Sequence, residues 1–222
     1  MTKINYQKEL EKIISSFSKD LSPKKPSLLL HACCGPCSSY VIEYLASIFD
    51  ITIYYYNPNI YPQAEYERRL EELKKFLSIF PEALKNQVNL IVDNYEPKDY
   101  FKATNVLNEP NLQTEAEKGE RCRRCYKLRM ERSWNFACKN NFDWFTTTLS
   151  ISPHKDSEMI NEIGRNLESS KKENSIKTKF LPSDFKKNGG YLRSTQLSNE
   201  YNLWRQDYCG CIYSIRNSEE KK

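Results

Sequence analysis

Long hydrophobic runs are absent from this sequence of 222 residues, and every apolar stretch is far shorter than a membrane-spanning helix requires. A secretory signal is missing as well, because the segment 1–21 is charged and amphipathic throughout. These absences favour a cytoplasmic protein without a membrane partner.

A strong charge imbalance is also lacking. The 34 lysines and arginines nearly balance 29 aspartates and glutamates, which gives a formal net charge of +5. Such a mild excess permits an anionic partner without requiring one. Histidine occurs only at His31 and His154, and neither internal repeats nor low-complexity linkers are found. The length and the missing linkers favour one catalytic domain spanning residues 1–222.

Short runs of β-branched and aromatic residues, each bounded by turn residues, indicate strands. They cover residues 27–32, 50–57, 88–94, 143–150 and 176–181. Helical patterns are expected at 1–21, 37–48, 62–80, 115–140, 155–168 and 195–206. Because strands and helices alternate, we predict an α/β fold, a Rossmann-like parallel sheet flanked by helices, with reactive groups at the carboxyl ends of its strands. The long charged segment 104–140 is predicted to be a helical insertion.

Cysteine is the strongest chemical signal, with eight residues. In a reducing cytoplasm they do not favour a disulfide framework, so metal binding or redox chemistry becomes the leading interpretation. Seven fall into three tight groups: Cys33, Cys34 and Cys37; Cys122 and Cys125; Cys209 and Cys211. The eighth, Cys138, has apolar neighbours and is expected to be a buried helix residue.

Two of the groups contain the C-x-x-C spacing, at 34–37 and 122–125, which lets two sulfurs turn toward one ion. Three arginines flank the second pair, and their positive charge stabilises thiolates. A structural zinc ion needs four ligands and would use only part of the thiol set. Ligation of an iron–sulfur cluster by four thiolates uses the set better, and zinc stays the alternative.

The adjacent Cys33 and Cys34 stand where the first predicted strand meets a Gly-Pro step. Neighbours in a strand point to opposite faces, so their thiols converge only if the chain has turned there. Cys37 would then open a helix, whose N-terminal N–H groups lower the pKa of a thiol. In 209-CGC-211 glycine permits a sharp fold, so this pair either closes as a readily reduced disulfide or ligates metal.

Five motifs stand in order along the chain. They are 31-HACCGPC-37, 55-YYNPNIYPQAEYERR-69, 119-GERCRRCYKLRM-130, 147-TTLSISPHKD-156 and 205-RQDYCGC-211. Together they resemble the epoxyqueuosine reductases of the QueH type, over about residues 27 to 216. The resemblance implies an oxidoreductase that converts epoxyqueuosine, at the wobble position of tRNA, to queuosine. This is the last step of queuosine biosynthesis, and it implies a [4Fe-4S] cluster as cofactor and an external electron donor.

The resemblance also implies roles for the clustered cysteines. The implied ligands of the cluster are Cys33, Cys34, Cys122 and Cys125. The implied redox-active pair is Cys209 and Cys211, and a second iron would recruit Cys33, Cys37 or Cys211. All seven are therefore candidate metal ligands, and Cys37 joins the CGC pair among the candidate catalytic residues. Whether Cys33 and Cys34 share the cluster or divide between two metals stays open.

Converting an epoxide to an alkene consumes two electrons and two protons and releases water. The hypothesis is that an exposed iron binds the epoxide oxygen as a Lewis acid while the cluster feeds in single electrons. Candidate proton donors are His31, His154, Tyr61, Asp156 and Tyr208. Candidate phosphate contacts are Arg68, Arg69, Arg121, Arg123, Arg124, Lys127 and Arg129. An unpaired anticodon base can also stack on an aromatic ring such as that of Trp204.

Two other functions stay open. An iron–sulfur tRNA sulfur transferase on a related fold would need ATP, yet 31-HACCGPCSS-39 stands where its phosphate loop belongs, and only Ser38 and Ser39 resemble that loop. A zinc-binding module that binds nucleic acid is the other alternative.

Overall fold

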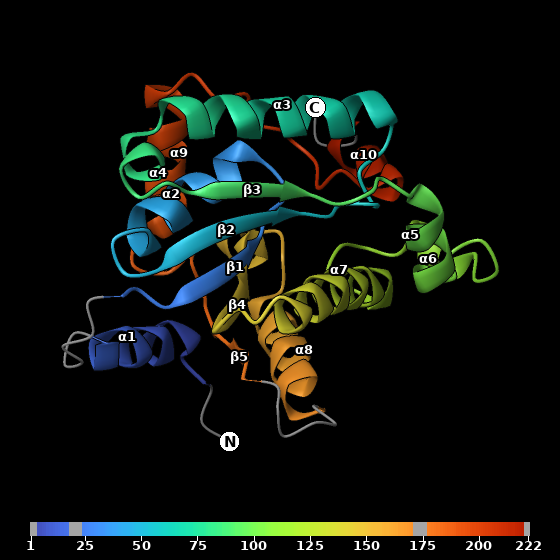
Figure 1. Ribbon diagram of the computed structural model, residues 1–222. Coiled ribbons are helices and arrows are strands. Elements are labelled where there is room, and N and C mark those ends of the chain that lie inside the picture. The colour runs from blue at the N-terminus through green and yellow to red at the C-terminus, as the bar shows by residue number, and fades with distance from the viewer. Residues whose placement is uncertain (1–3, 18–23, 171–176, 220–222) are drawn as a thin grey trace.

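A single parallel sheet forms the centre of the molecule. The computed structural model describes residues 4–17, 24–170 and 177–219. The strands are β1 (Ser27–His31), β2 (Asp50–Tyr55), β3 (Asn89–Val92), β4 (Trp144–Thr147) and β5 (Lys179–Phe180). All pairs are parallel, in the order β3-β2-β1-β4-β5, with helices on both faces (Figure 1). The predicted Rossmann-like α/β fold is confirmed, and each strand lies inside its predicted range.

Alternation along the strands creates two apolar cores, one on each face of the sheet. Leu28 and Leu30 of β1 belong to one core and Leu29 to the other, because successive strand residues point to opposite faces. The first core is covered by α2 (Gly35–Leu45), α3 (Gln63–Ile79), α4 (Pro81–Lys85) and α9 (Gly190–Glu200). The second is covered by α7 (Glu120–Lys139) and α8 (Ser157–Ser169). Burial on both faces explains why the strands are nearly continuous apolar runs.

The predicted strand 143–150 is shorter in the structure. β4 ends at Thr147, whose side chain accepts a hydrogen bond from the backbone N–H of Leu149 and so caps the 3₁₀ helix η1 (Thr148–Ile151). The short turn directs the chain across the edge of the sheet toward α8. The motif residues that follow β4 are therefore placed next to those that follow β1.

The helix predicted at 195–206 is displaced toward the N-terminus. α9 begins at Gly190, after Gly189 has taken a left-handed conformation with φ of +76°, and it ends at Glu200. Residues 203–208 have no regular secondary structure and lie against α3, where the backbone N–H of Trp204 donates to Glu72. The predicted helix included this segment because the segment carries apolar residues. In the structure those residues pack on α3 without continuing the helix.

The segment between β3 and β4 contains α5 (Pro97–Thr104), α6 (Asn111–Thr114) and α7. α7 packs on the sheet through Met130, Trp134 and Ala137, whereas α5 and α6 extend past its edge (Figure 1). Glu115 fixes the start of α7, because its carboxylate accepts the backbone N–H groups of Glu120 and Arg121. The N-terminal part of α7, which carries Cys122 and Cys125, therefore lies where the strands end.

The ends of the chain contribute two further helices, α1 (Tyr6–Phe17) and α10 (Ile212–Glu219). Part of the helix predicted at 1–21, and residue 176 of the last predicted strand, fall outside the described residues. Among the helices in the described part of the chain, none is both long and apolar enough to cross a membrane.

Replacement of Leu10 by Ala tests whether α1 belongs to the main core. Leu10 is fully buried in the first core, so we expect the free energy of unfolding to fall by about 2–5 kcal/mol. Denaturant unfolding of metal-free protein measures this change. Lys8→Ala, at an exposed position of the same helix, should change stability by no more than about 0.5 kcal/mol. Equal stability of both variants would show that α1 is not part of the cooperative unit.

Candidate active site

The turn that follows β1 brings three thiols together. Cys33, Cys34 and Cys37 have their Sγ atoms within 4.8 Å of one another, and the adjacent pair are 3.8 Å apart. β1 ends at His31 and α2 begins at Gly35, so the adjacent cysteines lie in the connecting turn and not in the strand. Both thiols therefore face the same side, and the three residues are able to hold a metal ion.

Among these three thiols, Cys33 is the one whose pKa is lowered. Hydrogen bonds from the thiols of Cys34 and Cys37 lower its pKa despite burial, and nearby cations add to the effect. Burial, together with the Cys33 thiolate, raises the pKa of Cys34 to about 12. Hydrogen bonding to the thiols of Cys33 and Cys34 raises the pKa of Cys37. The lowered pKa predicted for Cys37 is therefore wrong, because its neighbours outweigh the effect of the helix N-terminus.

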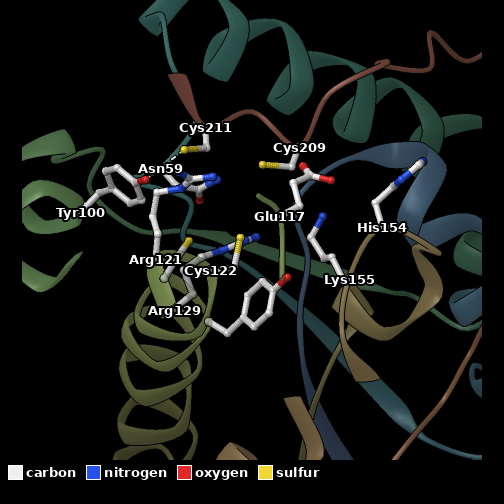
Figure 2. A pocket seen from close by; sticks show the side chains of 12 residues that line it. Asn59, Tyr100, Glu117, Arg121, Cys122, Arg129, His154, Lys155, Cys209 and Cys211 are labelled. Atoms are coloured by element: carbon white, nitrogen blue, oxygen red, sulfur yellow. Dashed lines mark hydrogen bonds between the residues drawn. The ribbon is translucent and has the colours of Figure 1, made fainter. Parts of the chain in front are cut away.

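Four more thiols line a small cavity beside this turn. Cys122 and Cys125 lie one helical turn apart at the start of α7, and Cys209 and Cys211 precede α10. Figure 2 shows Cys122, Cys209 and Cys211 around this cavity. The cavity has a volume of about 20 Å³, which is room for little more than one water molecule. The Tyr100 hydroxyl lies 2.9 Å from the sulfur of Cys211. Metal binding at this group would therefore require its side chains to move apart or to turn toward the first group.

Arg69 and Gly210 hold the loop between Cys209 and Cys211. The Arg69 guanidinium is buried, donates to the carbonyl oxygens of Tyr208 and Cys209 at 3.3 and 3.2 Å, and pairs with Glu65 at 2.6 Å. Gly210 has φ of +101°, and an added Cβ would lie 2.9 Å from Arg69 Nη1. Glycine is thus needed both for the left-handed backbone and for the close approach of the guanidinium. The sharp fold predicted between the two cysteines is confirmed.

Two cations connect the thiol groups. Arg129 is buried, and Cys125, Cys33 and Cys209 raise its pKa although burial acts to lower it. Lys155 follows η1, and burial likewise acts to lower its pKa, but Cys209 and the thiols after β1 raise it above the ordinary value. Thiols from three distant segments of the chain therefore surround one pair of positive charges.

A larger cavity, of about 260 Å³, opens beside the thiols. Cys37 from one thiol group and Cys209 from the other line it, together with Lys155. The segments 151–154 and 205–208 form much of the remaining wall, and Tyr191 lines it with a side chain that is 39% exposed. A ligand that enters from the solvent can therefore reach both thiol groups and a cation.

His31 is fully buried and is not one of the residues that line this cavity. Its Nε2 lies 3.2 Å from the carbonyl oxygen of Tyr56, which can only accept, and its Nδ1 lies 2.8 Å from the Thr147 hydroxyl. Burial and the nearby Arg129 lower the pKa of His31 to about 3. His31 is therefore a neutral residue that ties β1 to β2 and β4, as the sequence allowed, and not a proton donor.

The other predicted proton donors divide into two pairs. His154 and Tyr208 line the larger cavity. The Asp156 carboxylate instead accepts the N–H groups of Glu158 and Met159 and caps α8. Tyr61 is 44% exposed, and its carbonyl oxygen accepts the Tyr208 hydroxyl.

Most of the arginines predicted to contact phosphate have other roles. Arg69, Arg121 and Arg129 are buried, and Arg121 donates to the carbonyl oxygens of Leu112 and Gln113. Their prediction as surface contacts was wrong, because an arginine on a charged helix can turn inward when buried carbonyls need donors. Arg123 and Arg124 pair with glutamates. The Arg68 guanidinium lies 3.6 Å from the ring centroid of the half-buried Trp204, and Lys127 is exposed.

No two cysteines are joined in a disulfide, so Cys209 and Cys211 are both thiols here. Hydrogen bonding from Cys211, together with Lys155, lowers the pKa of Cys209 despite burial, and Cys211 takes a raised pKa in exchange. Cys138 lies on α7 away from these groups, so its predicted helix position is confirmed, but it is only partly buried against the second core.

Three polar residues of the site were not singled out from the sequence. Lys155 and Gln206 stand inside quoted motifs, next to residues that were considered, but a lysine or glutamine alone carries no recognisable spacing. Tyr100 lies on α5, outside every motif. Its contact with Cys211 depends on how α5 packs on α7, which no local pattern specifies.

A Rossmann-like sheet with thiols from three segments at its carboxyl edge defines a thiol-rich α/β domain able to bind metal. A family model described as "Epoxyqueuosine reductase QueH" matches residues 28–217. The chain therefore belongs to the QueH family of epoxyqueuosine reductases.

Curated relatives agree with this family. Epoxyqueuosine reductase QueH of Staphylococcus epidermidis is 41% identical over 212 residues, covering 96% of this chain and 85% of the relative. The protein of the same name from Streptococcus pyogenes is 40% identical, covering 96% and 79%. The Thermotoga maritima protein of that name is 34% identical, covering 88% and 93%. The similarity thus extends over at least 79% of each of these chains.

Replacing Arg69 by Met should destabilise the site that it anchors. The change leaves Glu65 and two carbonyl oxygens without their donor, so we expect a loss of about 3–5 kcal/mol in the free energy of unfolding. Iron retained after anaerobic reconstitution should fall as well, because the Cys209–Cys211 loop loses its support. Arg68→Met, one residue away and exposed, loses only its stacking on Trp204, worth about 0.5–1 kcal/mol. Equal effects of the two variants would contradict an anchoring role for Arg69.

Proposed function

We propose that this chain reduces the epoxide of epoxyqueuosine in tRNA to the alkene of queuosine. The observation that carries the proposal is that a cavity of about 260 Å³ is lined by Cys37, Cys209 and Lys155, which come from three different segments. A substrate in this cavity can therefore contact Cys37, Cys209 and the positively charged Lys155 at the same time. Membership of the family and the printed names of the relatives support the choice of substrate.

The proposed cofactor is a [4Fe-4S] cluster with Cys33, Cys34, Cys122 and Cys125 as ligands. Thiolates are the ligands that iron–sulfur clusters use, and the chain offers three more nearby for a second iron or a redox pair. The buried Arg129 and the half-buried Lys155 fit such a group, because a thiolate-ligated cluster carries negative charge that nearby cations offset. When bound, the cluster would supply electrons one at a time. The reducing cytoplasm, where thiols persist, is the proposed location.

The reaction must break the two carbon–oxygen bonds of the epoxide. Two electrons from an external donor and two protons balance the release of water and the formation of the carbon–carbon double bond. Lys155 lines both cavities, and the surrounding thiols keep it positively charged. We assign Lys155 to stabilise the oxygen as negative charge develops on it. His154 and Tyr208 remain candidates for delivering protons, since both line the larger cavity.

The RNA is proposed to approach the solvent side of the larger cavity. A modified base at the wobble position is unpaired and can be turned into a pocket. Tyr191 lines this cavity and is 39% exposed, with the Arg205 guanidinium 5.6 Å from its ring centroid. Such a ring suits stacking against a neighbouring base. The exposed Lys118 and Lys187 lie around an adjoining hollow that shares Pro153 and Lys155 with the cavity, and they suit phosphate contacts.

Replacing Cys122 or Cys125 by Ser tests the proposed function directly. Protein is purified without oxygen, its iron and sulfide are quantified, and tRNA carrying epoxyqueuosine is analysed for queuosine after reduction. Wild-type protein should contain both elements and form queuosine, whereas each variant should lose the cluster absorbance and at least about a hundredfold of the activity, because a ligand has been removed.

Cys138→Ser is the matched control, since this cysteine lies outside both thiol groups, and it should retain iron and activity. Zinc near one equivalent without iron in active wild-type protein would contradict the cofactor assignment. Absence of queuosine formation by iron-loaded protein with a chemical reductant would overturn the function.

Tyr191→Ala should weaken binding of the tRNA. Loss of one base-stacking contact predicts a rise in Kd of roughly 5- to 100-fold. Fluorescence anisotropy with the labelled anticodon arm measures it. Leu84→Ala removes an apolar side chain that is 56% exposed on α4, away from the cavity, and should leave Kd unchanged. A Tyr191 variant that binds as tightly as wild type would place the RNA on another face.

A further inference from the structure

A residue that lines the larger cavity, Gln206, carries a buried oxygen without a hydrogen-bond partner. Gln206 lies in the segment between α9 and the Cys209–Cys211 loop. Nε2 of this side chain donates to the sulfur of Cys34 at 3.0 Å, while Oε1 has no partner among the described residues. An acceptor that is removed from water and left unpaired is costly, so its retention calls for an explanation.

Other polar groups in the same wall are satisfied by the protein itself. The Ser194 hydroxyl donates to the carbonyl oxygen of Tyr191 at 2.8 Å, and the Ser214 hydroxyl to that of Cys211 at 2.6 Å. The Tyr208 hydroxyl donates to the carbonyl oxygen of Tyr61 at 3.0 Å. Among these groups, the Gln206 oxygen is the one that still needs a donor, and the cavity that Gln206 lines is the nearest space that a ligand carrying a donor can occupy.

We propose that Gln206 is a specificity residue, whose Oε1 accepts a hydrogen bond from a hydroxyl or N–H group of the modified base. The inference rests on the proposed function and adds a residue that recognises the substrate. Because Nε2 is held by Cys34, the carboxamide cannot rotate freely, and its oxygen is fixed relative to the thiols that follow β1. The same side chain therefore positions the substrate and supports a proposed metal ligand.

A fixed acceptor discriminates between substrates that have a donor at this point and those that lack one. An unmodified guanine at the wobble position has no substituent to fill the cavity and leaves the oxygen unpaired. Sites built to bond a polar group reject analogues without it far more strongly than apolar pockets reject a missing methylene. Gln206 should thus raise the preference for modified over unmodified tRNA.

Two substitutions separate the functions of the two ends of the carboxamide. Gln206→Glu keeps an oxygen acceptor but removes the N–H donor to Cys34, and Gln206→Met removes both at similar length. The readouts are Kd for tRNA carrying epoxyqueuosine, Kd for the same tRNA with guanine, KM and kcat, and the visible absorbance and EPR spectrum of the iron–sulfur protein. Thermal unfolding checks that each variant folds.

We expect Gln206→Met to raise Kd and KM for modified tRNA by roughly tenfold or more and to leave Kd for unmodified tRNA unchanged. Gln206→Glu should keep Kd for modified tRNA within about threefold while changing the spectrum, because Cys34 has lost its donor. Where Gln206→Met does not fold, Gln206→Asn, which withdraws the oxygen by one methylene, should give the same loss of preference.

Unchanged tRNA preference in a folded Met or Asn variant overturns the role of Gln206 and leaves the proposed function intact, provided that wild-type protein forms queuosine. An equal loss of binding to both tRNAs also overturns it, since Gln206 would then support the surface in general. Wild-type protein that neither prefers nor reduces the modified tRNA overturns the proposed function, and this inference falls with it.

Discussion

The attraction between thiolates and nearby cations allows so many thiols to lie together in a desolvated site. A thiolate in a desolvated site is unfavourable unless a cation or a hydrogen-bond donor compensates for it. Arg129 provides this from α7, and it also donates to Asn57, whose amide in turn donates to the carbonyl oxygen of Ala32 at 2.9 Å. One buried side chain therefore fixes α7 against the turn that carries Cys33. Lys155 acts in the same way from the segment that follows β4.

The sheet supplies the rigidity that such a site needs. Leu28, Leu29 and Leu30 are fully buried on its two faces, so the ends of β1, β2 and β4 are fixed relative to one another. His31 reinforces this edge through its contacts with Tyr56 and Thr147. The Cys209–Cys211 loop lies outside the sheet and is held by Arg69 and by the backbone N–H of Tyr61, which donates to the carbonyl oxygen of Gly210. Precise placement of reacting groups on rigid elements is what a redox site requires.

Local patterns were enough to predict the alternating elements and the importance of the clustered cysteines. The strands could be found because their residues are apolar on both faces, and the motif turn because Gly35 and Pro36 interrupt the strand pattern. The shifted position of α9 could not be found, since an apolar residue such as Leu203 can pack on the core from a helix or from an irregular segment. The inward arginines were missed because burial of Arg121 depends on carbonyl groups of α6, and only the packing of α6 on α7 places these groups beside the guanidinium.

The sequence by itself determined the fold class, the family and the set of thiols, because strand periodicity and short motifs are local properties. Only the tertiary structure decided which thiols have a lowered pKa, which cations accompany them and which buried polar atom lacks a partner. Those properties depend on burial and on distances between segments more than 100 residues apart, as between Gln206 and Cys34. Desolvation and Coulomb interactions act through space, and no pattern along one chain specifies them.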